Sequence, residues 1–353
     1  MGIKGVVFTA PGVVELRDDL ELPELGPGDI EVVTRASGVS PGTEKNRLFG
    51  GNWAVGYPSV SGYQQVGMVG RVGPDVLSPK PGERVYTHDW GHPFVGQTAR
   101  PGAHAAVRIG PADDVSPEVR VDEESVAVDE VDSLGRVRRD RYVTVLPDDI
   151  PDAEAAFLSL SSIGLHASGR GAVGVDSRCL VLGLGLLGLF AGQGAVVRGG
   201  TAIGVDRIPL RLDKAREVGF ESVLDFSSDT YWTDLANLGP FDVVMETTGN
   251  NDLIDEVMSR GLMRRGGRFV MVGGRWKVSY DFSLAHLYEV SMVQTEHHTY
   301  DEVQQVIRLR RAGRWKIGPL LTHFVRPHQV KQVWDMILNG EDSLGVVFEW
   351  ENE

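Results

Sequence analysis

The chain has 353 residues, of which 42% are hydrophobic and 24% charged, the composition of an ordinary globular protein long enough for two domains. Its formal net charge of −14 argues against nucleic acid or an anionic membrane as a partner, because both bind clustered Lys and Arg. A single cysteine, Cys179, excludes an internal disulfide framework, and without an apolar run long enough to cross a bilayer or a signal-peptide pattern we expect a cytoplasmic protein.

The first 110 residues or so are rich in strand and turn signals. Short runs of β-branched and apolar residues occur at 6–8, 30–33, 67–72 and 83–86, and Pro-Gly pairs separate them. This pattern predicts an all-β lobe.

Residues 113–141 differ from the segments on either side. They are strongly acidic, and the sequence DSLG at 132–135 is typical of a hairpin turn. We interpret this segment as a solvated insertion, with a surface for a partner as the alternative.

Residues 179–206 have the pattern of a dinucleotide-binding β-α-β unit. An apolar strand-like run at 179–182 leads into a G-x-G-x-x-G turn, and a helix and a second strand at 201–205 follow. The first glycine permits a tight turn, the second lets backbone N–H groups approach a pyrophosphate, and the third lets the helix pack on the strand. The positive end of the helix dipole then faces the phosphates. The residues expected to contact the cofactor in this turn are Gly183, Gly185, Leu186, Leu187 and Gly188.

The second strand of this unit ends on Asp206, whose carboxylate can accept hydrogen bonds from the ribose hydroxyls of NAD and would repel a 2′-phosphate. NAD(H) is therefore favoured, although Arg207 could turn toward a 2′-phosphate, so NADP stays open. Ligands collect at the carboxyl ends of parallel strands, so two later strand ends should also face the cofactor. Their residues are Thr247, Thr248, Gly249, Val272, Gly273 and Gly274.

Alternating helix and strand signals continue to residue 272 and predict a doubly wound parallel sheet. The expected helices lie at 210–218 and 251–262, and the expected strands at 222–224, 241–245 and 268–272. Helices at 301–311 and 328–338 and a strand at 345–349 should follow. We predict an α/β protein in which residues 1–150 and 296–353 form a β-rich domain and residues 151–295 form an inserted Rossmann nucleotide domain.

Four further segments carry recognisable motifs: SGVSPGTE at 37–44, YPSVSGYQQVG at 57–67, KPGERV at 80–85 and SLSSIGLHA at 159–167. Together with the glycine turn, they resemble the medium-chain dehydrogenase/reductase (MDR) superfamily over nearly the whole chain. The turn SPGTE is most similar to members of the bacteriochlorophyllide hydroxyethyl dehydrogenase type. The resemblance implies a GroES-like catalytic domain and hydride transfer to or from a nicotinamide.

The chain departs from this resemblance at the metal positions. The zinc alcohol and polyol dehydrogenases hold their catalytic metal with a cysteine, a histidine and a cysteine or glutamate, where this chain has Ser40, Tyr63 and Ser159. Hydroxyl groups are poor zinc ligands at neutral pH, and the structural zinc lobe of these relatives needs four cysteines. We therefore predict a zinc-independent protein.

Without zinc, side chains must handle the hydroxyl proton during hydride transfer. Tyr63 replaces a ligand directly, and its hydroxyl could bind a substrate oxygen and transfer a proton if its pKa is lowered. The resemblance places Thr43 at the hydroxyl residue that contacts the substrate alcohol, and Ser40 in the same cleft. The resemblance aligns the relay histidine of relatives with Asn46, so that the proton relay is absent or served by Lys45 or Glu44. For Glu44 the alternative role is a structural ion pair.

Histidines are further candidates. His88 follows the strand at 83–86, where the resemblance places the substrate cleft, and His297 follows the return from the nucleotide domain. An imidazole there could act as a base or bind a polar substrate, although most histidines only make structural hydrogen bonds. A metal site made of His88, Asp89 and His92 is a remaining alternative.

These observations lead to one main hypothesis and two alternatives. The main one is an NAD(H)-dependent oxidoreductase that interconverts a secondary alcohol and a ketone of a polar small molecule, such as a sugar, a cyclitol or a biosynthetic intermediate. The first alternative is an NADPH-dependent enone or quinone reductase, and the second is a non-catalytic dinucleotide-binding sensor or scaffold. Relatives often join nucleotide-domain sheets at their edges, so we expect a homodimer formed through the strand at 269–272.

Overall fold

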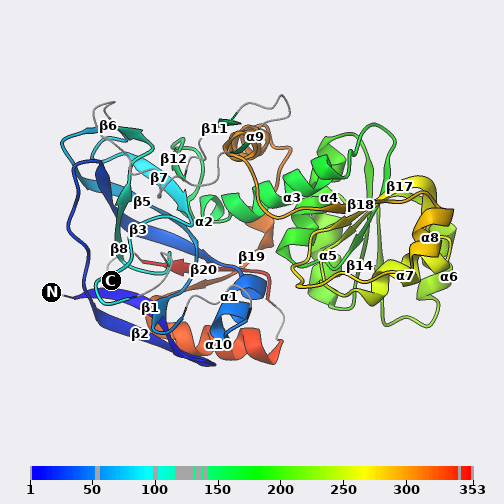
Figure 1. The fold of residues 1–353 in the computed structure, drawn as a ribbon, viewed down its shortest axis with the longest axis horizontal. Coiled ribbons are helices and arrows are strands. Elements are labelled where there is room, and N and C mark those ends of the chain that lie inside the picture. The colour runs from blue at the N-terminus through cyan, green and yellow to red at the C-terminus, as the bar shows by residue number, and fades with distance from the viewer. Residues whose placement is uncertain are drawn as a thin grey trace. The chain divides into compact units, whose positions relative to one another are not determined.

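The computed structural model describes residues 2–51, 56–97, 102–115, 130–131, 137–138, 142–340 and 343–350. It consists of two compact units, which Figure 1 shows as a ribbon. Unit 1 comprises Met1–Leu158 with Leu321–Glu353, and unit 2 comprises Ser159–Leu320. No helix within the described residues is both long and apolar enough to cross a membrane.

Unit 1 is the β-rich part of the molecule. Its largest sheet has the order β12-β7-β5-β3-β20-β19, with β8 also paired to β3, and a smaller sheet has the order β2-β1-β4. The strands are β1 (Ile3–Ala10), β2 (Val13–Leu20), β3 (Asp29–Val39), β4 (Ser59–Val60), β5 (Gln64–Val72), β6 (Val76–Ser78), β7 (Arg84–His88), β8 (Val107–Pro111), β9 (Asp114–Val115), β12 (Val143–Val145), β19 (Leu321–Val325) and β20 (Gly345–Glu349). The helices are α1 (Pro41–Leu48), α2 (Asp152–Ala155) and α10 (Val330–Asn339).

The predicted acidic insertion lies mostly outside the described residues. Within it, β10 (Glu130–Val131) pairs antiparallel with β11 (Val137–Arg138), and the turn expected at 132–135 lies outside the described residues.

The register of the large sheet brings three sequence motifs of unit 1 to one of its ends. Strand β3 runs antiparallel to β5, with Ser37 opposite Gln65, and β5 runs antiparallel to β7, with Gln64 opposite His88. The end of β3, the start of β5 and the end of β7 therefore lie at the same end of the sheet. Helix α1 follows β3 directly, so its first turn is at this end as well.

Unit 2 contains a six-stranded sheet in which every adjacent pair is parallel, with helices on both of its faces (Figure 1). The strand order is β15-β14-β13-β16-β17-β18, so the predicted doubly wound Rossmann sheet is confirmed. The strands are β13 (Arg178–Leu182), β14 (Thr201–Asp206), β15 (Ser222–Asp225), β16 (Phe241–Glu246), β17 (Met263–Met271) and β18 (Ser291–Gln294). The helices are α3 (Leu158–Arg170), α4 (Leu186–Val197), α5 (Pro209–Val218), α6 (Tyr231–Leu238), α7 (Asp252–Ser259), α8 (Phe282–Leu287) and α9 (Tyr300–Arg311).

Two features of unit 2 differ from the expectations. Strand β17 pairs with both β16 and β18, so the segment at 269–272 is interior and β18 is the edge strand, which corrects the expected dimer contact. The unit also extends to Leu320, past the predicted boundary at residue 295. The reason is packing: Trp315 stacks on Phe190 of α4 with ring centroids 6.0 Å apart, and Glu302 of α9 binds His166 of α3.

Candidate functional site

The glycine turn of unit 2 has the geometry of a phosphate cradle. Gly183 has a φ of +89°, which favours glycine, and a Cβ on Gly188 would lie 1.9 Å from the carbonyl oxygen of Gly183. Gly185 is the N-cap of α4 and has no side chain with which to cap the first N–H groups of the helix. A Cβ on Gly185 would meet no atom within 4 Å. This open space in front of a helix N-terminus can receive an anion.

Asp206, at the end of β14, holds the glycine turn in place. Its Oδ2 accepts the Leu184 N–H at 2.7 Å, and its Oδ1 accepts the Arg207 and Ile208 N–H groups at 2.7 and 3.0 Å. Arg211 Nη1 lies 3.4 Å from Oδ2. Arg211 was not among the predicted residues, although its position in the first turn of α5 was a signal. Asp206 therefore binds the Arg207 backbone and lies near the Arg211 guanidinium, at the place expected for the adenosine ribose.

The predicted contact residues after β16 and β17 come together, but their side chains are already engaged. The Thr247 hydroxyl contacts the carbonyl oxygens of Leu182 and Gly183, at 3.0 and 2.8 Å. A Cβ on Gly273 would lie 2.3 Å from the Gly249 nitrogen, so the two loops touch through their backbones. The Thr248 hydroxyl donates to Glu246. What these loops can offer a ligand is therefore mainly backbone, which includes the predicted residues Val272 and Gly274.

Tyr63 and Ser40 form the centre of the candidate site in unit 1. They share a hydrogen bond between their side chains, and Tyr63 is only 7% exposed. Burial raises the pKa of Tyr63 well above its ordinary range, while the Ser40 hydrogen bond and the nearby Arg47 guanidinium oppose this shift in part. The pKa of Tyr63 is therefore raised, whereas proton shuttling would require a lowered pKa. Tyr63 is therefore better suited to donate a hydrogen bond than to abstract a proton.

Glu44 is fully buried and belongs to a chain of hydrogen-bonded polar groups that begins at the Ser40 backbone. One of its oxygens accepts the Ser40 N–H at 2.8 Å, and His104 Nε2 lies 3.1 Å from the other. His104 Nδ1 lies 2.7 Å from Ser37 Oγ, which also accepts the Trp350 indole N–H at 2.8 Å. The sequence analysis missed His104. These contacts fit the structural role that was one of the two interpretations of Glu44, which stays a prediction.

The other predicted residues of α1 are less enclosed. Thr43 is half-buried in the first turn, Asn46 is half-buried, and Lys45 is exposed. Arg47, which the sequence analysis did not single out, lies 5.8 Å from the Tyr63 ring centroid and 3.7 Å from Asp89. A cation of this kind favours an anionic or electron-rich group next to Tyr63.

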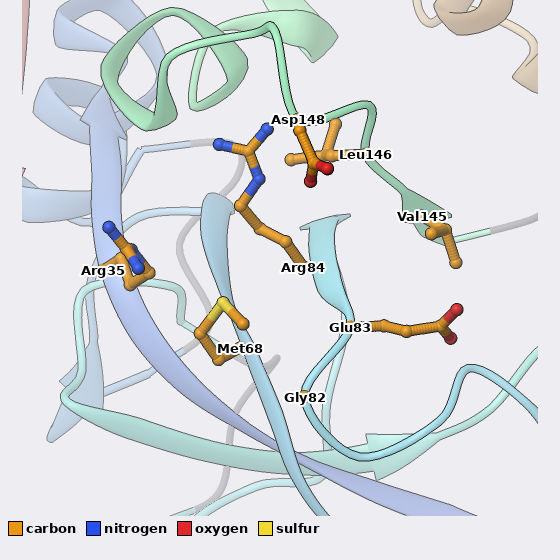
Figure 2. Close-up of a pocket in the computed structure, with 8 residues that line it drawn as sticks. All are labelled: Arg35, Met68, Gly82, Glu83, Arg84, Val145, Leu146 and Asp148. Atoms are coloured by element: carbon orange, nitrogen blue, oxygen red, sulfur yellow. The ribbon is translucent and has the colours of Figure 1, made fainter.

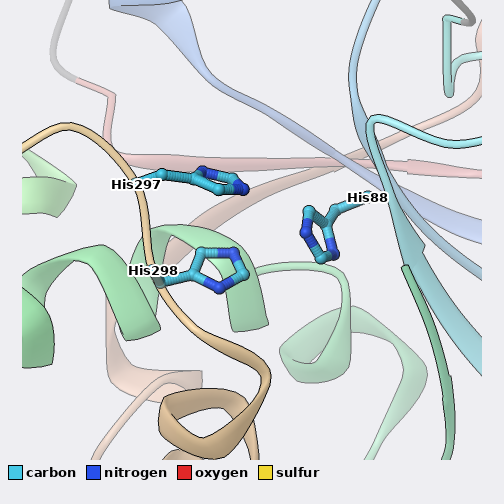
Figure 3. A group of neighbouring side chains, drawn as sticks. All are labelled: His88, His297 and His298. Atoms are coloured by element: carbon cyan, nitrogen blue, oxygen red, sulfur yellow. The ribbon is translucent and has the colours of Figure 1, made fainter. Parts of the chain in front are cut away.

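Figure 3 shows the predicted candidates His88 and His297 together with His298, which follows His297 in the chain. His88 is buried at the end of β7 in unit 1, stacked on Tyr86 with ring centroids 5.8 Å apart. His297 and His298 follow β18 in unit 2, and their ring centroids are 4.4 Å apart. His298 Nε2 lies 2.9 Å from Ser159 Oγ, a contact that the sequence did not predict.

The alternative metal site was the set of His88, Asp89 and His92. Two of these three residues have other partners, because Asp89 pairs with Arg47 and His92 pairs with Asp29.

Unit 1 also contains a pocket of about 450 Å³ that the sequence analysis did not anticipate (Figure 2). Asp152 pairs with two of its arginines, with Arg35 Nε at 2.6 Å and Arg84 Nη1 at 2.8 Å. The pocket contains none of the predicted catalytic residues. Its lining is Arg35, Met68, Gly82, Glu83, Arg84, Val145, Leu146 and Asp148.

Comparisons with known proteins agree with the two-part architecture. A family model described as zinc-binding dehydrogenase matches residues 187–310, a segment of unit 2 that contains neither Ser40, Tyr63 nor Ser159. Sorbitol dehydrogenase of Bacillus subtilis strain 168 is 29% identical over 231 residues, which span 63% of this chain and 61% of that protein. L-threonine 3-dehydrogenase of Sinorhizobium fredii is 25% identical over 371 residues, which span 99% of each.

Among solved structures, an alcohol dehydrogenase of Escherichia coli CFT073 in complex with NADH superimposes with a TM-score of 0.80. It is 19% identical and covers 98% of this chain and 99% of its own, so the fold is shared over the full length. In fold and in sequence, this chain is similar to the zinc-type alcohol and polyol dehydrogenases of the MDR superfamily.

Proposed function

We propose that this chain is an NAD(H)-dependent oxidoreductase that interconverts a secondary alcohol and a ketone of a polar small molecule without catalytic zinc. The observation that carries the proposal is the open helix N-terminus at Gly185, held in place by Asp206 in a parallel sheet. The sequence relatives named above are dehydrogenases of a polyol and of a hydroxy amino acid, and the solved relative binds NADH.

The residues of unit 2 fit a dinucleotide. The space at Gly185 suits the pyrophosphate, Asp206 marks the adenosine side, and the backbones of Gly249 and Gly273 mark the nicotinamide side. A bound nicotinamide would supply or accept the hydride. The protein's part is to hold that ring and to manage the proton of the substrate oxygen.

NADP(H) is the second candidate cofactor. The Asp206 carboxylate accepts hydrogen bonds from three backbone N–H groups, and Arg211 Nη1 lies 3.4 Å from its Oδ2. Arg207 follows Asp206 directly and precedes α5. Both arginines could bind a 2′-phosphate, whereas the carboxylate would repel it. We propose NAD(H) because Asp206 is almost fully buried and fixed, so a phosphate beside it would lie close to a charge that cannot turn away.

Tyr63 is the residue we propose for contact with the substrate oxygen. Because burial raises the pKa of Tyr63, its phenol stays protonated at neutral pH and can donate to a carbonyl oxygen during reduction. The Ser40 side chain, to which the Tyr63 hydroxyl is hydrogen-bonded, helps to fix the position of that donor. Thr43, His88 and His297 remain proposed substrate contacts.

The donors present do not fit the zinc site of the relatives. Ser40 and Tyr63 are hydrogen-bonded to each other, and Ser159 is bound to His298. Hydroxyls satisfied in this way compete poorly with water for Zn²⁺, which prefers thiolate, imidazole and carboxylate. Ser40, Tyr63 and Ser159 are therefore not proposed as metal ligands, and no step is assigned to a metal.

A polar substrate is supported by Gln64, which is fully buried next to Tyr63. Its Nε2 is 3.5 Å from the Gly38 carbonyl, and its Oε1 has no hydrogen-bond partner among the described residues. A buried amide oxygen without a partner costs free energy that a donor on a ligand or a water can recover. Substrate hydroxyl or amino groups supply such donors.

We also propose a homodimer, joined at the edge strand β18. Among the described residues β18 pairs only with β17. The segment that precedes β18 in the sequence has three exposed apolar side chains, Trp276 (78%), Phe282 (72%) and Leu287 (66%). Exposed strand edges and large apolar side chains are typical of association surfaces. Analytical ultracentrifugation tests this: a dimer is expected, and a monomer at micromolar concentration would contradict it.

The function itself is tested by titrating the purified protein with NADH and NADPH and then measuring turnover on ketone and enone panels. We expect tighter binding of NADH and reduction of polar ketones. Preference for NADPH with enone turnover would favour the quinone or enone reductase. Tight binding without turnover on either panel would favour the non-catalytic sensor or scaffold.

A further inference from the structure

Glu246, at the end of β16, is a fully buried carboxylate in the nucleotide-binding unit. It accepts the Thr248 N–H at 2.6 Å and the Gly249 N–H at 3.0 Å, both in the loop that follows β16. It also pairs with the guanidinium of Arg275. A buried carboxylate is stable only with such partners, because an isolated charge would lose its hydration without replacement.

Arg275 connects three segments of unit 2 with one side chain that is only 8% exposed. Its Nη2 donates to Glu246, its Nε donates to the Gly273 carbonyl at 3.1 Å, and its Nη1 donates to Asn251 Oδ1 at 3.3 Å. The planar guanidinium can make these bonds at once, whereas a lysine ammonium could not reach all three. Arg275 therefore fixes the loop after β17 against the loop after β16 and the start of α7.

The two loops that Arg275 joins are in backbone contact and have little freedom to shift separately. Gly249 has a φ of +79°, and its Cβ would lie 2.9 Å from the Gly274 carbonyl oxygen. The Val272 and Gly273 N–H groups both donate to the Glu246 carbonyl, at 2.8 and 2.9 Å. The charge pair thus lies beneath a surface made of backbone from both loops.

The position of this pair in the sheet assigns it to one half of a dinucleotide. The strand order turns at β13, with β14 and Asp206 on one side and β16 and β17 on the other. A dinucleotide bound across this turning point places its adenosine half at β14 and its nicotinamide half at β16 and β17. Glu246 and Arg275 are both on the nicotinamide side.

We propose that Arg275 is a positioning residue for the nicotinamide half of the cofactor. By pairing with Glu246 and binding Gly273, it fixes the backbone surface on which the nicotinamide ring would rest, and so sets the affinity for NAD(H) without affecting the affinity for the adenosine half. The inference rests on the proposed function, because it requires that the crevice binds NAD(H).

Two ligands separate this role from a general effect on folding. NADH binding is measured by its fluorescence and ADP binding by calorimetry, on the full chain and on the variants Arg275→Met and Arg275→Lys. For Arg275→Met we expect NADH to bind about ten-fold or more weakly, the usual scale for losing hydrogen bonds to a charged group, with ADP affinity within about two-fold of wild type. Arg275→Lys retains the cation and protects the fold, and we expect an intermediate loss for NADH alone.

Arg265→Met is the matched control, because Arg265 pairs with Glu289 at 2.8 Å in the same unit but is largely exposed. It should bind both ligands as wild type does. Two results would overturn the inference. The first is that Arg275→Lys, and also Arg275→Met if it folds, binds NADH with wild-type affinity. The second is that each variant loses affinity for ADP and for NADH equally. A wild-type protein that binds ADP but not NADH would overturn the proposed function as well, which separates that failure from one seen only in the variants.

Discussion

His298 and Ser159 are joined by a buried hydrogen bond, with Nε2 2.9 Å from Oγ, and both residues lie in unit 2. The resemblance described above places Ser159 at the position of the third metal ligand of the zinc-type relatives. Here its hydroxyl is engaged by an imidazole instead, which supports a site that works through hydrogen bonds between side chains. The same is true of Ser40, whose hydroxyl is bound to Tyr63.

The space in front of α4 gives a test of cofactor binding that does not depend on the substrate. Because a Cβ at Gly185 meets no atom within 4 Å and the residue has a φ of −63°, Gly185→Ala should leave the free energy of unfolding nearly unchanged. The added methyl group would occupy the space expected for the pyrophosphate, so the Kd for NADH should rise by roughly ten-fold or more. Fluorescence titration with NADH, together with urea unfolding, measures both quantities. Unchanged NADH affinity in a folded variant would mean that the pyrophosphate does not bind there.

Tyr63→Phe tests the proposed contact with the substrate oxygen. Removing the hydroxyl should lower kcat by roughly a hundred-fold, as expected for loss of a hydrogen-bond donor to the substrate oxygen, while NADH affinity stays the same. Tyr57→Phe is the matched control, because its hydroxyl donates to the Leu48 carbonyl at 2.8 Å and has no proposed role in catalysis. Steady-state kinetics on the best ketone compares the two. Near wild-type kcat in Tyr63→Phe would exclude this tyrosine and leave the histidines as candidates.

The Glu44–His104 pair should contribute strongly to the stability of unit 1. Both side chains are fully buried, so His104→Leu leaves the Glu44 carboxylate with only the Ser40 N–H as a partner among the contacts described above. We expect the free energy of unfolding to fall by about 3 kcal/mol, the scale for breaking a buried pair. Glu44→Gln combined with His104→Leu should cost less than the sum of the single changes. A loss below about 1 kcal/mol in His104→Leu, measured by urea unfolding, would show that the pair is not important for stability.

Cys179 gives a prediction for pH dependence. Burial, and to a lesser extent the Asp242 carboxylate, raises the pKa of its thiol to about 12. Since an unfolded cysteine has a pKa of about 8.5, the folded state binds this proton more tightly, and the resulting stability is present below pH 8.5 and lost as the pH rises toward 12. At pH 8 a thiol reagent should therefore react only after unfolding in guanidinium chloride. Fast reaction in the native protein would contradict a buried thiol.

The sequence predicted those parts of the site that lie close together along the chain. The glycine turn and Asp206 belong to one β-α-β unit of recognisable spacing, so both the fold and the cofactor crevice followed from local pattern. The partners of Ser159 and Glu44 could not be found in this way, because His298 is 139 residues from Ser159 and His104 is 60 residues from Glu44. Strand β18 was missed because it has only four residues, of which Val293 alone is buried, and the dimer contact was therefore assigned to β17.

The contact between Arg275 and Glu246 could not be predicted from the sequence either. Arg275 follows the predicted glycines Gly273 and Gly274 directly, yet its partner Glu246 is 29 residues away on a neighbouring strand. A charged residue after a strand usually faces solvent, and only the contact with the buried Glu246 shows that this one turns inward.

The central claim is that this chain carries out hydride transfer with NAD(H) while side chains, and not zinc, control the proton. The most direct measurement is the zinc content of the purified protein, taken with its NADH-dependent ketone reduction before and after dialysis against a chelator. We expect far less than one zinc per chain and the same kcat after dialysis. One zinc per chain, with turnover that is lost on chelation and restored by Zn²⁺, would contradict the account.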